Sequence, residues 1–124
     1  MKESFEELYK LMQLNCQYSQ WTLQTSMKGH AEELKSEIDE MIAEINNGDY
    51  KQFQEELGDV FWNLLKLMVI SENKGIFNIK NLFEQTHAKF KRRKPYLLEG
   101  KIVSREEEHN IWKEVKEQEK NERK

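Results

Sequence analysis

The sequence predicts an all-α protein, a helical bundle organised around a central antiparallel pair of helices. No alternation of apolar and polar residues runs far enough to form a sheet, and the 124 residues include only one proline and five glycines. The stretch from Phe53 to Ile70 is apolar on nearly every side of a helix, which is typical of a helix inside a bundle. Charged residues make up 35% of the chain, which fits helices with solvated outer faces. We therefore expect a single helical domain over residues 1–124.

Composition also excludes several classes of function. The net charge of −3 indicates neither a nucleic acid polymer nor an anionic membrane as a partner. The longest apolar run, Val60 to Ile70, is interrupted by Asn63 and Lys66 and is too short to span a bilayer. The single cysteine, Cys16, cannot form an internal disulfide, and the N-terminal residues lack the apolar region of a signal peptide. We expect a protein of the reducing cytoplasm.

The segment from Phe5 to Tyr18 is expected to form the first helix, because its apolar residues recur at helical spacing. In that helix Cys16 is expected to be a small core residue. Residues 21–29 are expected to be a connecting piece, in which Trp21 either covers the core or stacks on a ligand. His30 stands at the entry to the next helix and is expected to be a polar end-of-helix residue rather than a ligand.

The segment from Ala31 to Asn46 is the clearest amphipathic helix, and it ends at a turn in which Gly48 can adopt a positive φ. At about 100° per residue, its glutamates form one row along the edge of the apolar stripe. These residues are Glu33, Glu37, Glu40 and Glu44. Such a row is most often a solvated acidic face, so its interpretation depends on the helix that follows.

That next helix carries Glu56 and Asp59 three residues apart, hence on one face, and Asn63 continues the strip one turn on. Because the turn between the two helices is short, they should form an antiparallel hairpin. Antiparallel packing brings Glu37 and Glu40 opposite Glu56 and Asp59. Four converging carboxylates form an oxygen-rich site for Mg²⁺ or Mn²⁺, whereas zinc would favour histidine and cysteine.

Ile79 to Arg93 is expected to be a fourth helix, with Leu82, Phe83, Thr86 and Phe90 facing inward, and it ends before Pro95. Its last turns are strongly basic. A solvated helix end explains this run adequately, and the alternative is phosphate binding by Lys89 and Arg93, which lie four apart and can both point toward the acidic site.

After a loop over residues 96–104, Ser104 is expected to cap a last, mostly polar helix over residues 105–124. Trp112 in that helix either closes over the site or anchors the tail.

Several of these motifs, in this order, resemble the MazG-type all-α nucleoside triphosphate pyrophosphohydrolases. Glu37-x-x-Glu40 followed by Glu56-Leu-Gly-Asp59 resembles the acidic signature of that family. Further similar segments are Trp21 to Thr25, Lys89 to Pro95 and Trp112 to Lys120, so the resemblance covers roughly residues 14 to 120. Ser36 and Lys94 depart from the usual pattern, and such positions bear on substrate preference more than on the metal site.

The resemblance implies Mg²⁺-dependent hydrolysis of nucleoside triphosphates to monophosphate and pyrophosphate, to remove noncanonical or excess nucleotides. It implies that Glu37, Glu40, Glu56 and Asp59 are the metal-binding and catalytic residues and that Lys89 and Arg93 bind phosphate. Asn63, Trp21 and Trp112 are candidate substrate contacts. The alternatives are a dUTP- or dCTP-preferring enzyme or a phosphoribosyl-ATP pyrophosphohydrolase of the same fold, and, in another class, a non-catalytic helical interaction module.

The apolar surface of the central helix also predicts association. Trp62 and Val69 lie on the side away from its main stripe, and an exposed apolar patch usually marks an interface. Two-fold pairing of hairpins would complete a four-helix bundle. The resemblance agrees, so we expect a homodimer or a tetramer with Trp62 buried between chains.

Overall fold

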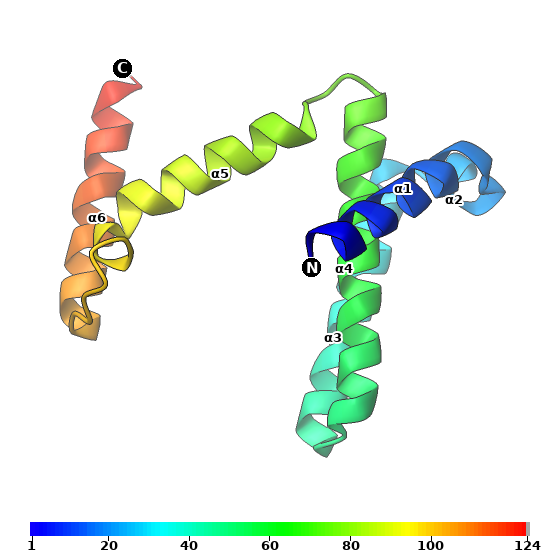
Figure 1. Cartoon of the computed structure of the whole chain (residues 1–124), viewed down its shortest axis with the longest axis horizontal. Coiled ribbons are helices and arrows are strands. Elements are labelled where there is room, and N and C mark those ends of the chain that lie inside the picture. The colour runs from blue at the N-terminus through cyan, green and yellow to red at the C-terminus, as the bar shows by residue number, and fades with distance from the viewer. Residues whose placement is uncertain (124) are drawn as a thin grey trace. The chain divides into compact units, whose positions relative to one another are not determined.

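The computed structural model describes residues 1–123, which contain six α-helices, one 3-10 helix and no strand (Figure 1). The helices are α1 (Lys2–Tyr18), α2 (Gln20–Gln24), α3 (Met27–Asn47), α4 (Tyr50–Asn73), α5 (Ile79–Arg93), the 3-10 helix η1 (Pro95–Leu97) and α6 (Arg105–Glu122). The all-α class is therefore confirmed. The chain divides into two compact units, the first ending at Ile79 and the second beginning at Lys80.

Helices α3 and α4 of the first unit form the predicted antiparallel hairpin. Gly48 ends α3 with a φ of 71°, a left-handed conformation that glycine adopts without a steric penalty. Asp49 then caps α4 by accepting a hydrogen bond from the Gln52 backbone N–H at 3.1 Å. This tight turn fixes the register of the two helices and hence the positions of their acidic residues.

Helix α1 packs against α4, and the core of the first unit lies between them. Met12 and Leu65 are fully buried there, and Val69 is 1% exposed. The prediction that Val69 belongs to an exposed patch is therefore wrong, because Val69 already lies in the core of the single chain. Three large apolar side chains of α4 do remain 36–46% exposed: Leu57, Phe61 and Leu64.

The segment expected to be a simple connection is largely helical. Ser19 caps α2 by accepting from the Thr22 N–H, and Ser26 caps α3 by accepting from the Gly29 N–H. Helix α3 therefore begins at Met27, four residues earlier than expected. His30 consequently lies inside α3 and is fully buried, which corrects its interpretation as a polar residue at a helix end.

The second unit consists of α5, η1 and α6. Ser104 caps α6 as predicted, accepting from the Glu107 N–H at 3.1 Å. Tyr96 is buried and donates its hydroxyl to Glu108, which ties η1 to the start of α6. The buried residue of α6 is an acid, Glu119, which is paired with arginines of α5.

The expected inward face of α5 is confirmed only in part: the Phe90 ring lies 6.0 Å from the Trp112 ring of α6, and Leu82 is half-buried. Phe83 and Phe90 are 47% and 39% exposed, and Thr86 is also exposed. At the end of α5, Arg93 is 9% exposed. None of the helices in residues 1–123 combines the length and the apolar character needed to cross a membrane.

Candidate functional site

Three carboxylates from the two arms of the hairpin converge at one point. Glu37 comes from α3, and Glu56 and Asp59 come from α4. One oxygen of each lies within 4.8 Å of the others. Glu37 and Glu56 are half-buried, and Asp59 is exposed. Glu40 does not belong to this group and is exposed, but it lies close enough to Glu37 to form a hydrogen bond with it.

The cluster is electrostatically strained without a cation. Burial, the charge of Glu40 and its hydrogen bond, and then the charges of Asp59 and Glu56 raise the pKa of Glu37 to about 7. The Oε2 atoms of Glu37 and Glu56 are buried and have no hydrogen-bond partner among residues 1–123. Gln52 donates only a long hydrogen bond of 3.4 Å to the other oxygen of Glu56.

These features fit a hard divalent cation. Buried carboxylate oxygens normally have partners, and the two orphaned oxygens are acceptors that a metal ion would satisfy. The donors are all carboxylate oxygens, the set that Mg²⁺ and Mn²⁺ prefer. The amide nitrogen of Asn63 does not contact these carboxylates, because it donates to the backbone oxygen of Asp59 at 2.8 Å.

The predicted phosphate-binding residues lie in the second unit. Lys89 is exposed, with its ammonium 5.7 Å from the centre of the Phe90 ring. Arg93 donates from Nη2 to Glu119 Oε2 at 3.0 Å, and its guanidinium stacks 4.7 Å from the centre of the Trp112 ring. Arg93 is therefore a buried, paired residue and not part of a solvated helix end.

Glu119 joins the two helices of the second unit through a pair of arginines. Arg92 Nε donates to the same carboxylate at 2.8 Å. The hydrogen bond from Arg93, followed by the contributions of Arg92, outweighs the effect of burial and lowers the pKa of Glu119 to about 2. Beside this pair a hollow of about 770 Å³ is lined by Trp112 and by cationic residues of α6, including Lys113, Lys116 and Lys120. Trp112 thus contacts Arg93 and also faces an open, basic surface.

Sequence reasoning missed a second polar group of the first unit. Trp21 is 70% exposed, and its indole N–H donates to Glu33 Oε1 at 2.9 Å. Lys66, interpreted only as an interruption of an apolar run, is 4% exposed and donates to Glu33 Oε2 at 2.9 Å. A lysine within an apolar helix was the available signal, because a buried lysine requires a counter-charge. Its partner lies 33 residues away and is not evident from spacing.

Comparison with known proteins is decisive for the family. Residues 25–98 match the MazG nucleotide pyrophosphohydrolase domain. The chain belongs to the MazG nucleotide pyrophosphohydrolase family. The fold is similar to the crystal structure of a mazG-related protein from Thermotoga maritima, with a TM-score of 0.84 and 26% identity over 90% of this chain and 98% of that one. No curated protein matches the chain.

The MazG match includes residues of both units, among them Glu37, Asp59, Lys89 and Arg93, whereas Trp21 and Trp112 lie outside the matched range. The carboxylate cluster therefore lies within the part of the chain that defines the MazG family. The predictions of a single functional domain and of the roles of individual site residues remain predictions.

Proposed function

We propose that this MazG-family protein hydrolyses nucleoside triphosphates to the monophosphate and pyrophosphate with bound Mg²⁺, and that Mn²⁺ can replace Mg²⁺. The observation that carries the proposal is the group of three carboxylates with two buried, unpaired oxygens inside the matched domain. Removal of noncanonical or excess nucleotides in the cytoplasm is the role we infer for it.

Each residue has a distinct part in this proposal. Glu37, Glu56 and Asp59 hold the cation, and Glu40, which lies beside Glu37, is proposed as a fourth ligand. When bound, the metal ion would polarise the attacked phosphate and neutralise charge on the leaving pyrophosphate. One carboxylate of the cluster orients the attacking water or takes its proton.

The remaining contacts are with the nucleotide itself. Lys89 and Arg93 donate charge-assisted hydrogen bonds to phosphate oxygens. Arg93 uses Nε and Nη2 for the Glu119 carboxylate, so its remaining nitrogen, Nη1, is the one proposed to reach a phosphate oxygen. Asn63, Trp21 and Trp112 are proposed to contact the nucleoside. We also propose that the protein works as a homodimer or tetramer, because apolar side chains of α4 remain exposed in the single chain.

The test is a pyrophosphate-release assay with the common ribo- and deoxyribonucleoside triphosphates and with phosphoribosyl-ATP, each with Mg²⁺, with Mn²⁺ and with EDTA. We expect metal-dependent release from at least one substrate and none from Asp59→Asn. A preference for dUTP, dCTP or phosphoribosyl-ATP would assign one of the alternative activities of the same fold. If no substrate releases pyrophosphate and Mg²⁺ does not stabilise the protein, the chain is a non-catalytic helical interaction module.

A further inference from the structure

Trp21 combines high exposure with a fixed orientation. The residue is 70% exposed, so its burial contributes little to the core. Its indole N–H nevertheless donates to Glu33 Oε1 at 2.9 Å, and the Thr25 hydroxyl donates to its backbone oxygen at 2.6 Å. An exposed side chain usually samples several rotamers, whereas this one is restricted at both its ring and its backbone.

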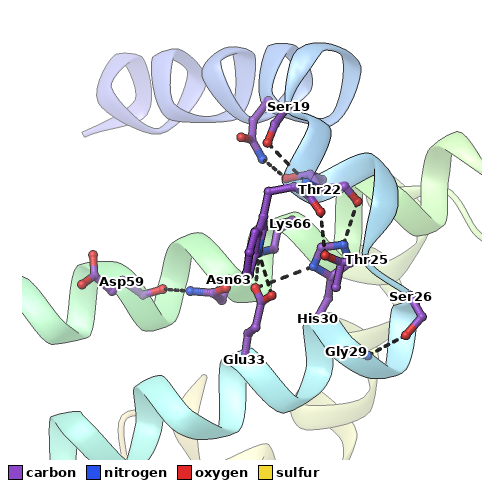
Figure 2. A network of polar contacts seen from close by, with 12 residues as sticks. Ser19, Thr22, Thr25, Ser26, Gly29, His30, Glu33, Asp59, Asn63 and Lys66 are labelled. Carbon is purple, nitrogen blue, oxygen red and sulfur yellow. Dashed lines mark hydrogen bonds and ion pairs between the residues drawn. The ribbon is translucent and has the colours of Figure 1, made fainter.

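The acceptor of the indole N–H is itself anchored. Lys66 is 4% exposed and donates to Glu33 Oε2 at 2.9 Å, so Glu33 uses one oxygen for the ammonium and the other for the indole (Figure 2). Burial alone would raise the pKa of Glu33, but the hydrogen bonds from Lys66 and Trp21 and the charges of Lys66 and His30 lower it. Glu33 is therefore an ionised and directed acceptor at neutral pH.

The short helix that carries Trp21 is held in place from two sides. A five-residue helix is not stable alone, because the free-energy cost of nucleating a helix exceeds the stabilisation that one turn of hydrogen bonds provides. In Figure 2 the ring of His30 points at this helix, and its Nε2 lies 3.0 Å from the Thr22 backbone oxygen. A carbonyl oxygen can only accept, so Nε2 carries its proton. From the other side, the Asn15 amide donates to the Thr22 hydroxyl at 3.0 Å.

The network also has a fixed place relative to the carboxylate cluster. Glu33 precedes Glu37 by four residues on α3, which is about 6 Å along the helix axis. Lys66 follows Asp59 by seven residues on α4, about 10 Å along its axis, with Asn63 between them (Figure 2). The network therefore lies about one helical turn from the carboxylate cluster along α3 and about two turns from it along α4.

We propose that Glu33 is a positioning residue that holds the Trp21 ring as a stacking surface for the nucleotide base, and that Lys66 fixes Glu33 for this purpose. The proposal rests on the proposed function. An aromatic face that is fixed before binding loses less conformational entropy on stacking, which is the general advantage of preorganisation. The fold itself has little need for this hydrogen bond, since it orients a ring that lies mostly in solvent.

The test compares variants of the full-length protein on the nucleoside triphosphate that it hydrolyses fastest, with inorganic triphosphate as a competitor that has no base. Trp21→Ala should raise KM about 5- to 150-fold, the range for loss of one base–aromatic stack, and should leave the Ki of triphosphate unchanged. Glu33→Ala should raise KM in the same direction by at least about fivefold, again without changing that Ki. Glu32→Ala is the matched control, because Glu32 is an exposed neighbour on the same helix.

Glu33→Gln separates positioning from stability. Its single side-chain oxygen can still accept from the indole N–H, but the NH2 group that replaces the other oxygen cannot accept from Lys66, and the charge that balances Lys66 is lost. Both Glu33 variants should therefore melt at a similarly lowered temperature, but Glu33→Gln should raise KM less than Glu33→Ala. If Glu33→Ala fails to fold, Trp21→Phe takes its place: it retains a ring, lacks the N–H donor, and should give a KM between those of the wild type and Trp21→Ala.

The proposal is overturned if Glu33→Ala has the KM of Glu32→Ala, if Glu33→Gln raises KM as much as Glu33→Ala, or if the Ki of triphosphate rises together with KM. For the Trp21→Phe arm, a KM equal to that of the wild type overturns it. Failure of the proposed function looks different, because then no variant, nor the wild type, releases pyrophosphate from any nucleotide.

Discussion

Replacing Asp59 by asparagine should make the metal-free protein more stable and remove its response to Mg²⁺. The oxygens of Glu37, Glu56 and Asp59 lie within 4.8 Å of one another. Two unit charges at that separation repel by about 0.9 kcal/mol at the dielectric constant of water and by about 3.5 kcal/mol at an effective value of about 20. Asp59 is exposed, so the lower figure applies more closely, and loss of its two repulsive pairs should stabilise the metal-free fold by about 1–2 kcal/mol.

In the wild type, bound Mg²⁺ should outweigh the repulsion between the carboxylates and stabilise the folded protein. At a Mg²⁺ concentration of about 100 times the Kd, mass action adds about 2.7 kcal/mol, which for a chain of this length corresponds to a rise in Tm of about 8–13 °C. Asp59→Asn should gain less than about 2 °C from Mg²⁺ if its oxygen is a required ligand. Asp39→Asn provides the control, since Asp39 is an exposed acid of α3 outside the cluster.

The assay is thermal unfolding followed by circular dichroism, in EDTA and in MgCl₂, at pH 5.5 and pH 8. A carboxyl group whose folded pKa is raised costs native stability as the pH rises from its ordinary value of 4.5 through about 7, as for Glu37. The metal-free wild type should thus be more stable at pH 5.5 than at pH 8, and Asp59→Asn should show less of this difference. A full Mg²⁺ response in Asp59→Asn would refute the assignment of this cluster as the metal site.

Three further predictions concern the second unit and association. The pKa of Glu119 is lowered from 4.5 to about 2. Its ionised form therefore stabilises the second unit fully above pH 4.5, and this stabilisation is lost as the pH falls toward 2. Glu119→Gln should remove that acid dependence in a pH titration of helicity, and Glu114→Gln should keep it; identical curves would contradict the prediction. Arg93→Lys should raise the KM for nucleotide about tenfold or more, because lysine cannot reproduce paired guanidinium hydrogen bonds, whereas Lys91→Ala should not. An unchanged KM in Arg93→Lys would limit Arg93 to a structural role. Light scattering at low micromolar protein should give a dimer or larger for the wild type and a smaller species for Leu64→Glu, whose side chain is 44% exposed on α4. A folded, active wild-type monomer of 15.0 kDa would contradict the interface.

The hairpin and its acidic residues could be predicted because their determinants are local. Gly48 marks the turn, the spacing of Glu56 and Asp59 places them on one face, and the short connection sets the register. The one difference is Glu40, which the structure leaves beside the group of three rather than within it. Spacing along a helix gives the face on which a residue lies, but not the rotamer that decides which oxygen reaches the common point.

The interactions that could not be predicted join residues far apart in the sequence. Glu33 and Lys66 are 33 residues apart, and Arg93 and Glu119 are 26 apart. Such pairs depend on which helices pack together, and on how closely, so no period in the sequence reveals them. The burial of His30 could not be predicted for a local reason. The predicted helix began at Ala31, whereas Ser26 caps α3 and places its first residue at Met27.

The treatment of buried charge elsewhere in the chain strengthens the case for a cation. Lys66 is paired with Glu33, and Glu119 is paired with Arg93 as well as with Arg92. Within residues 1–123, the buried carboxylate oxygens without a partner belong to Glu37 and Glu56 alone. An unpaired buried carboxylate is among the most costly features that a fold can retain, and replacement by glutamine would lower that cost. The chain balances its other buried charges with neighbouring side chains but leaves these two oxygens unpaired beside a third carboxylate. A partner that is not an amino acid best explains this difference. A divalent cation has the charge and the ligand preference to be that partner.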